Sequence, residues 1–479
     1  MPESTQDQLF SLLSDQTINR KQFTFHGDPL PSTLKTPSKL VVLSSGTPND
    51  GFFPINSIQL GITKKPHTPT SESFAIEKHA NEEDLLDIKD AFQYGPTEGH
   101  PQLLKFLKSF INEVNRPKYD SWDITLTNGT GDSLNKVFNL LVNPGDVVLV
   151  ESFTYKPVLN NIVNYGGIPY PVSINYGIEG DHGIDVEKLT NLLENWETIN
   201  PDKKKPKALY TIPTGQNPTG LTISQENRAK IYELAKAHNF IVIEDDPYGY
   251  IQLGEYTDGI HNVYDTEIPY KRFIEEILPS SYIQQDNSGH VIRLESFSKT
   301  FAPGSRIGFI VAHKRFIKEI IKYAQVSNRA PSGISQIIIS NFINQIGGIK
   351  GWIDWNIQVS KAYTERKNVL LKTLYNSSSF KKGQFNIVEP KAGMFAIIDI
   401  NFPNAKEDYR KDIEELRYKI LESGVVVVYG KNFAVNDDIA KGSKFIRITL
   451  ANSVDTDQIK EGGEKLVEGI EKYFESISA

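Results

Sequence analysis

Short apolar runs of strand length alternate with amphipathic helical patterns between residues 122 and 312. This alternation is typical of an α/β fold, in which helices cover both faces of a mostly parallel sheet. In such a fold, ligands bind beyond the carboxyl ends of the strands, so we expect functional side chains in the loops that follow them. The candidate strands are residues 124–126, 147–150, 170–174, 208–212, 240–243, 291–294 and 309–312.

The pattern changes after residue 312. Residues 314–375 show helical periodicity without a strand signal, and further strands and helices follow them. This change predicts a second, smaller α+β domain at the C-terminal end. Within the first region, residues 251–290 predict a long surface insertion around a short helix at 270–278. The later candidate strands are residues 385–388, 394–400, 425–429 and 445–450, with helices at about 408–422 and 456–476.

Chain length bears on the division into domains, since 479 residues exceed what one compact core usually holds. We expect an N-terminal arm at 1–40 and a segment at 41–90 that packs with the small domain. A large ligand-binding domain would span 91–350, and the small C-terminal domain 351–479.

Local patterns add detail to the N-terminal part. The arm has one short helical pattern around Leu9, Phe10, Leu12 and Leu13. Residues 41–48 predict a strand that runs into a Gly/Pro turn, and the polar residues 61–82 predict a surface loop.

Composition excludes several classes of protein. The formal charge is −7, from 52 basic and 59 acidic residues, which does not favour binding to nucleic acid or to an anionic membrane. No apolar run reaches the roughly 18 residues of a membrane-spanning helix. The chain has no cysteine, so disulfides, thiolate metal sites and a cysteine nucleophile are excluded. We expect a cytoplasmic protein.

A polar loop between the candidate strands 291–294 and 309–312 carries Lys299. Taken alone, a lysine in a loop is more simply a solvated surface residue. Ser296, Ser298 and Arg306, however, suit an anionic, aldehyde-bearing cofactor such as pyridoxal phosphate (PLP). In that interpretation Lys299 forms a Schiff base with the aldehyde, and the other three side chains hold the phosphate.

Other strand ends offer what such a cofactor needs. Residues 129–133 open a helix after a strand and could present amides to the phosphate, although an ordinary βα turn looks the same. Asp245 could pair with the ring nitrogen and keep it protonated. Asp246 is an equal candidate from spacing alone. The two carboxylates could also form a metal site, which we disfavour because no histidine lies near them in sequence.

Three further side chains follow candidate strands. Tyr155 suits stacking on the cofactor ring, while Asn217 and Tyr248 suit hydrogen bonds to its 3-oxygen. Each of them could instead be a packing or turn residue, as Asn-Pro often is. Their joint placement at successive strand ends favours the cofactor interpretation.

These motifs together resemble the signature of the fold-type I PLP-dependent aminotransferases. Residues 210–216 and 244–248 narrow the resemblance to the kynurenine/2-aminoadipate aminotransferase group and, within it, to the fungal aromatic amino acid aminotransferases. It extends from about Leu12 to the C-terminal helix. The motifs are Asn217-Pro218-Thr219-Gly220, Asp245-x-x-Tyr248, and Ser296-x-Ser298-Lys299 with Arg306.

The resemblance implies a role for each candidate. Lys299 would form the Schiff base and move the substrate proton, and Asp245 would pair with the pyridine nitrogen. Arg447 would grip the substrate α-carboxylate. The implied cofactor contacts are Thr130, Gly131, Tyr155, Asn217, Tyr248, Ser296, Ser298 and Arg306, with Tyr94 reaching the phosphate of a neighbouring subunit; the other implied substrate contacts are Gly46, Asn217 and Arg20. Relatives often carry Gln where Gly131 stands, so here only its amide would remain.

The implied function is transfer of an amino group from phenylalanine, tyrosine or tryptophan to 2-oxoglutarate by ping-pong chemistry in a homodimer with shared sites. Kynurenine and 2-aminoadipate are possible further donors. A PLP-dependent lyase or decarboxylase of the same fold is the nearest alternative. A PLP-binding regulator is disfavoured, since the segment before Val41 lacks two strong helices and the chain is acidic. A pseudo-enzyme is disfavoured because Lys299, Asp245 and Arg306 are all present.

Overall fold

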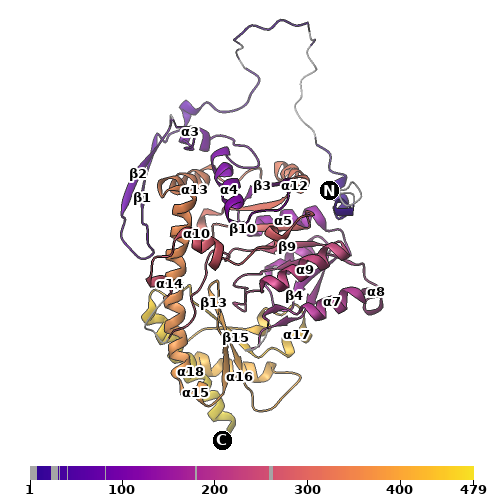
Figure 1. Cartoon of the computed structure of the whole chain (residues 1–479), viewed down its shortest axis with the longest axis vertical. Helices are drawn as coiled ribbons and strands as arrows, with labels where there is room; N and C mark the ends of the chain where they lie inside the picture. The colour runs from indigo at the N-terminus through magenta and orange to yellow at the C-terminus, as the bar shows by residue number, and fades with distance from the viewer. Residues whose placement is uncertain are drawn as a thin grey trace.

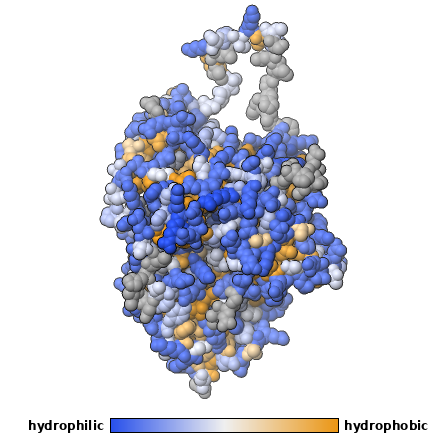
Figure 2. Space-filling model, viewed as in Figure 1, coloured by the Kyte–Doolittle hydropathy of each residue, from blue (hydrophilic) through white to orange (hydrophobic). Residues whose placement is uncertain are grey.

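The computed structural model describes residues 8–22, 31, 33–39, 41, 43–80, 82–177, 181–257 and 263–478. Two sheets dominate it, a seven-stranded sheet in the upper part of Figure 1 and a four-stranded sheet below. No helix in these ranges is both long and apolar enough to cross a membrane. The face seen in Figure 2 is mostly hydrophilic, with apolar side chains in scattered patches.

The larger sheet has the strand order β3-β11-β10-β9-β8-β4-β5. Every pair from β10 to β5 is parallel, whereas β11 runs antiparallel to both of its neighbours. The predicted mostly parallel α/β sheet is therefore confirmed. The strands are β3 (Trp122–Thr127), β4 (Val147–Glu151), β5 (Ile168–Val172), β8 (Pro206–Thr211), β9 (Ile241–Asp245), β10 (Val291–Ser296) and β11 (Gly308–His313).

Helices cover both faces of this sheet, because alternate apolar residues of each buried strand point to opposite sides. On β9, Ile243 joins one hydrophobic cluster and Val242 the other. The first cluster includes side chains of α5 (Thr130–Leu141), α6 (Pro157–Asn164) and α12 (Lys314–Val326). The second includes side chains of α4 (Pro101–Val114), α7 (Val186–Glu194), α9 (Gln225–His238) and α13 (Gly333–Gln345).

The smaller sheet is antiparallel, in the order β12-β13-β15-β14. The long helix α14 (Gly348–Asn376) descends beside both sheets in Figure 1 and packs against α18 (Thr456–Ser478), which also contacts α16 (Arg410–Glu422). The predicted α+β region is confirmed. Its strands are β12 (Phe385–Val388), β13 (Phe395–Ile400), β14 (Val428–Tyr429) and β15 (Phe445–Thr449).

Two local predictions in the N-terminal part were wrong. Residues 61–82 are not a plain loop, because they contain part of the antiparallel hairpin of β1 (Ser57–Ile62) and β2 (Glu72–Glu77). Its strands carry apolar residues at alternate positions, such as Leu60 and Ile62 on β1, and Ile76 of β2 packs in one cluster with Ile337 of α13. This period-2 pattern is short, and the polar residues 63–71 interrupt it. Residues 43–48 form no strand, and Val42 lies outside the described residues.

The remaining elements are short. They are α2 (Asp15–Ile18), η1 (Asp50–Phe52), α3 (Ile88–Ala91), β6 (Ile174–Asn175), β7 (Gly183–Ile184), α8 (Trp196–Ile199), η2 (Val263–Asp265), α10 (Tyr270–Arg272), η3 (Phe273–Ile277), α11 (Tyr282–Gln285), η4 (Pro303–Ser305), α15 (Ser378–Lys381), η5 (Gly430–Asn432) and α17 (Asp437–Lys441). The predicted short helix at 270–278 is confirmed as α10 and η3.

Candidate active site

Lys299 lies in the connection between β10 and β11. These strands pair antiparallel, with Ser296 opposite Gly308, so the connection is closed at its base by the sheet. Lys299 is half-buried, and burial together with the Arg306 guanidinium lowers the pKa of its amine, while Asp245 opposes that effect. A lysine amine with a lowered pKa spends more time unprotonated, which is the form that attacks an aldehyde.

The same connection supplies a cradle for an anion. The Ser296 hydroxyl donates to Oγ of Ser298 at 2.8 Å, and Nη1 of Arg306 donates to that Oγ at 3.3 Å. Nη2 of Arg306 also donates to the carbonyl of Asn128 at 3.0 Å, so the guanidinium lies against the turn that begins α5. Hydroxyls and a guanidinium at a helix N-terminus are the groups that bind a phosphate.

Two glycines shape the turn before α5. Gly129 has φ +84°, and a Cβ there would overlap the Arg306 guanidinium. Gly131, in the first turn of the helix, has no atom within 4 Å of a built Cβ, so space is open beside it. The Arg306 guanidinium and the N-terminal end of α5 therefore lie side by side, an arrangement that suits a phosphate.

Asp245 ends β9 beneath this cradle and is fully buried. Its Oδ2 accepts a hydrogen bond from the Tyr210 hydroxyl at 2.6 Å, whereas its Oδ1 has no partner among the described residues. Burial raises the pKa of Asp245 to about 7; the Tyr210 hydrogen bond and Lys299 counteract this, and Asp246 adds to it. A buried acceptor without a donor fits the N–H of a protonated pyridine ring.

The structure separates the two adjacent aspartates. Asp246 points to the opposite face of the sheet, where its Oδ2 forms an ion pair with Nη2 of Arg293 at 2.9 Å. Asp245 is therefore the carboxylate on the Lys299 side. Since the two carboxylates diverge, they do not converge on a common metal position.

Arg447 comes from β15 of the smaller sheet. Its Nη1 donates to Oδ1 of Asn217 at 2.9 Å, in the loop after β8 of the larger sheet. The guanidinium lies between the rings of Phe395 and Phe433, 4.5 and 4.7 Å from their centroids. Its buried Nε has no acceptor among the described residues, so the guanidinium has a free donor for a carboxylate.

Two tyrosines lie within electrostatic reach of Asp245. Tyr248 is buried, and its pKa is raised by burial and by Asp245, whereas Arg447 lowers it. Tyr155 is 39% exposed, and its pKa is raised by burial and by Asp245, while Arg306 lowers it. The structure thus brings the two predicted cofactor contacts, Tyr155 and Tyr248, together with the charged groups of Asp245, Arg306 and Arg447.

Three predicted site residues lie elsewhere in the single chain. Tyr94 is 70% exposed, and the Arg329 guanidinium lies over its ring, 5.5 Å from the centroid. Gly46 is exposed, with no atom within 4 Å of a built Cβ. Arg20 donates to the side chain of Asn139 on α5 and lies over the ring of Tyr323 on α12, 5.0 Å from its centroid.

Two side chains that support the site were not predicted. Tyr210 is an apolar-looking member of a buried strand, and only its register with β9 reveals that it reaches Asp245. Glu151, at the end of β4, accepts from Nε2 of Gln216 at 2.9 Å and from the Thr211 hydroxyl at 2.7 Å. Burial raises the pKa of Glu151 to about 7 despite these bonds. The sequence signal that could have identified Glu151 was its position at the end of an apolar, buried strand.

Comparisons with known proteins agree with this geometry. The family model described as "Aminotransferase class I and II" matches residues 63–466. Aromatic amino acid aminotransferase 2 of Saccharomyces cerevisiae is 38% identical over 470 residues, covering 92% of each chain. The mitochondrial kynurenine/alpha-aminoadipate aminotransferase of Mus musculus is 31% identical, covering 84% of this chain and 85% of the relative. The crystal structure of the aromatic aminotransferase Aro9 from C. albicans superposes with a TM-score of 0.92 at 38% identity, covering 97% of this chain and 98% of that one.

Proposed function

The chain belongs to the class I and II aminotransferase family, and from that premise we propose that it transfers the α-amino group of aromatic amino acids to 2-oxoglutarate with PLP as its cofactor. The predicted family, fold class, enzyme class and cofactor are confirmed. The relatives named aromatic amino acid aminotransferases and the L-tyrosine:2-oxoglutarate aminotransferase of Serpula lacrymans support the choice of donor and acceptor. The observation that carries the proposal is the convergence of Lys299, Asp245 and Arg447 at one site.

The residues present fit the cofactor. Oδ1 of Asp245 is a buried acceptor that lacks a donor, as the ring N–H requires. Tyr155 would stack on the ring, and Asn217 and Tyr248 would donate to its 3-oxygen. The phosphate would be held by Thr130, the Gly131 amide, Ser296, Ser298 and Arg306.

When bound, PLP supplies an electrophilic aldehyde and an electron-withdrawing ring that makes the substrate Cα–H acidic. Asp245 would keep the ring nitrogen protonated by remaining ionised. The Lys299 amine would take the proton from Cα of the amino donor and pass it to the former aldehyde carbon of the cofactor; in the second half-reaction it would move a proton in the opposite direction, onto Cα of the acceptor. Its lowered pKa suits this task, because a protonated amine cannot accept a proton.

Arg447 would bind the substrate α-carboxylate through its planar guanidinium. Phe395 and Phe433 hold this guanidinium from both sides, and Asn217 fixes one of its nitrogens. A fixed carboxylate fixes the direction of the Cα–H bond relative to Lys299, which selects proton removal over loss of the carboxylate.

The finer assignments belong to the proposal. Kynurenine and 2-aminoadipate are further candidate donors, for which the mouse relative gives support. Arg20 would serve donors with a distal carboxylate, and Gly46 would lie against the substrate. The domain division at residues 40, 90 and 350 and a cytoplasmic location also remain proposals.

A homodimer with shared sites is part of the same proposal. In the single chain, Val41 and Leu43 are 80% and 92% exposed, and Tyr94 is 70% exposed. Apolar side chains with this much exposed surface favour burial against another surface. In a dimer, Tyr94 would reach the phosphate of the partner subunit. Mass measurement in solution at several concentrations tests the dimer.

The decisive experiment mixes the purified holoprotein with a panel of amino acids and follows the cofactor absorbance while each product is identified. Formation of the matching oxo acid supports the proposal, whereas an amine with CO2 identifies a decarboxylase instead. Borohydride reduction followed by peptide mapping should place a pyridoxyl label on Lys299. The absence of that label would contradict the proposed function, and label without amino transfer would favour a PLP-binding regulator.

A further inference from the structure

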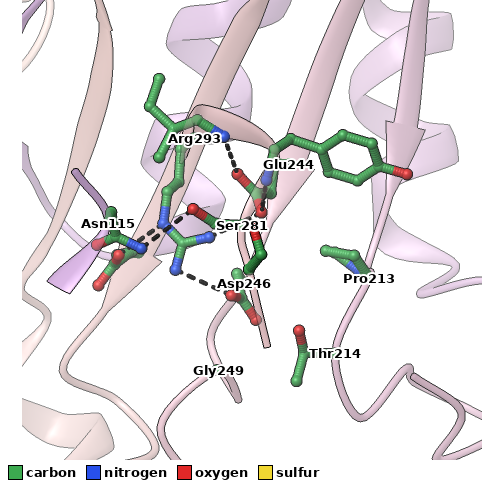
Figure 3. A network of polar contacts seen from close by, with 12 residues as sticks. Asn115, Pro213, Thr214, Glu244, Asp246, Gly249, Ser281 and Arg293 are labelled. Carbon is green, nitrogen blue, oxygen red and sulfur yellow. Dashed lines mark hydrogen bonds and ion pairs between the residues drawn. The ribbon is translucent and has the colours of Figure 1, made fainter. Parts of the chain in front are cut away.

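A buried charge cluster around Arg293, Glu244 and Asp246 lies beside the larger sheet (Figure 3). Its centre is Arg293 of β10, which pairs in register with Glu244 of β9. Nη1 of Arg293 lies 2.9 Å from Oε1 of Glu244, Nη2 lies 2.9 Å from Oδ2 of Asp246, and Nε lies 2.7 Å from Oε1 of Glu295. One guanidinium therefore contacts the acids on both sides of Asp245 in the chain.

The cluster is almost fully removed from solvent. Glu244 is 0% exposed, Asp246 4% and Arg293 1%. Arg228, also 0% exposed, adds a second positive charge nearby, but its hydrogen bonds go to the carbonyls of Pro213, Ser280 and Ile223 and to the Thr214 hydroxyl. Buried carboxylates need a charged or hydrogen-bonding partner, and the Arg293 guanidinium supplies a charged partner to all three acids.

The three acids depend on Arg293 to different degrees. Glu244 also accepts from the backbone N–H of Tyr282 at 2.9 Å, and Glu295 from the Tyr250 hydroxyl at 2.9 Å. The carboxylate of Asp246 has no ion pair or side-chain hydrogen bond other than Arg293 among the described residues, and its Oδ1 is without a partner. Asp246 also lines a cavity of about 190 Å³ beside the cluster. Of the three acids, Asp246 is thus the one that depends most on Arg293.

We propose that Arg293 is a positioning residue for amino transfer, which keeps Asp245 ionised by neutralising the acids on either side of it. This inference rests on the proposed function, in which Asp245 must hold the ring nitrogen protonated. A neighbouring uncompensated carboxylate raises the pKa of an acid, and a compensated one does so much less. Asp246 already acts in this direction on Asp245, so loss of its counter-charge would raise the pKa of Asp245 further.

The other charged and titratable groups stay unchanged in the test below. Those around Asp245 are Tyr210, Tyr155, Tyr248, Lys299 and Glu151, and those around Asp246, apart from Arg293 itself, are Arg228, Glu244, Glu295 and Tyr250.

The test measures the affinity of the apoprotein for PLP against pH. Affinity falls as the pH drops below the pKa of Asp245, because its carboxyl must then lose a proton before it pairs with the ring nitrogen. We expect Arg293→Gln to move this fall upward by about one pH unit and to weaken binding about tenfold at neutral pH. Arg272→Gln, which breaks the exposed pair with Glu276, is the matched control and should leave the curve unchanged.

The double variant Arg293→Gln/Asp246→Asn distinguishes charge from packing. We expect it to move the curve most of the way back to that of the wild type, because the Asp246 charge has gone together with its counter-ion and Glu244 keeps its hydrogen bond from the Tyr282 N–H. No restoration, or no shift in Arg293→Gln, would overturn the proposal. If Arg293→Gln does not fold, Asp246→Asn alone should move the fall to lower pH, and an unmoved curve would overturn the proposal equally. Failure of the proposed function would show separately, because the wild-type protein would then not bind PLP or would not transfer amino groups.

Discussion

Nη1 of Arg447 donates to Oδ1 of Asn217 at 2.9 Å, and this hydrogen bond joins β15 of the smaller sheet to the loop after β8 of the larger one. Arg447 would bind the substrate carboxylate, and Asn217 would bind the cofactor. The substrate is therefore oriented relative to the cofactor by a direct contact between their two binding residues. Changes at this contact should affect the reaction more than they affect cofactor binding.

Replacing Arg447 by Lys should lower kcat/KM for phenylalanine about a hundredfold. Lysine keeps the charge but cannot form two parallel hydrogen bonds to a carboxylate or lie flat between Phe395 and Phe433. PLP affinity should change less than about threefold, since Arg447 lies on the substrate side. Steady-state kinetics and a PLP titration of the apoprotein check both statements, and a large loss of PLP affinity would contradict the assigned role.

Replacing Asp245 by Asn should stabilise the apoprotein at high pH. The pKa of Asp245 is raised to about 7 by burial, so the folded state binds more protons than the unfolded chain between about pH 4 and 7. The stability contributed by this carboxyl is full below about pH 4 and is lost as the pH rises to 7. Asn carries no charge and can still accept from Tyr210.

The expected gain is up to about 4 kcal/mol in the free energy of unfolding at pH 8, with little difference near pH 4. Urea unfolding of both apoproteins at pH 4 and pH 8 measures it. An equal effect at both pH values would show that the change acts through packing rather than charge. The same variant should lose nearly all amino-transfer activity.

Replacing Gly129 by Ala should weaken PLP binding at least tenfold. Its φ of +84° is unfavourable for alanine, and the added Cβ would displace the Arg306 guanidinium from the phosphate cradle. Gly145→Ala is the matched control, since φ there is +79° but no atom lies within 4 Å of the built Cβ. That variant should lose about 1 kcal/mol of stability and keep its PLP affinity. Equal losses of affinity in both variants would place the cradle elsewhere.

Replacing Arg20 by Ala should impair glutamate and 2-aminoadipate about tenfold more than phenylalanine, if the arginine pairs with distal carboxylates. In the single chain Arg20 is held by Asn139 and by the Glu319 carbonyl, the latter at 3.2 Å. Comparing kcat/KM for the three donors decides the matter. Equal losses, together with a lower Tm, would show that Arg20 only anchors the arm.

The elements that could be predicted from the sequence share one property, a strong local pattern. Buried strands such as β4 and β9 begin with continuous apolar runs, and turns rich in Gly and Pro help to separate strands from helices. The β1–β2 hairpin was missed because the polar residues 63–71 separate two short stretches in which apolar residues alternate. Residues 43–48 show the opposite error, since a strand was predicted there and these described residues form none.

The site shows a similar limit. Motif residues such as Lys299 and Asn217 could be predicted because they follow strands whose ends meet in space. Asp245 and Asp246 could not be distinguished, because side-chain direction depends on strand register and on partners from distant segments. Tyr210 and Arg293 were missed for the same reason, since each acts through a contact with a neighbouring strand rather than through a local motif.

The pairing of Ser296 with Gly308 has a consequence for how the enzyme can move and evolve. Lys299 and Arg306 lie on one short hairpin whose length alone sets their separation. Motion of the smaller sheet can thus loosen or tighten the hold of Arg447 on substrate while the cofactor attachment stays undisturbed. Specificity can diversify around that moving part, whereas a single inserted residue in the hairpin would separate the covalent anchor from the phosphate anchor.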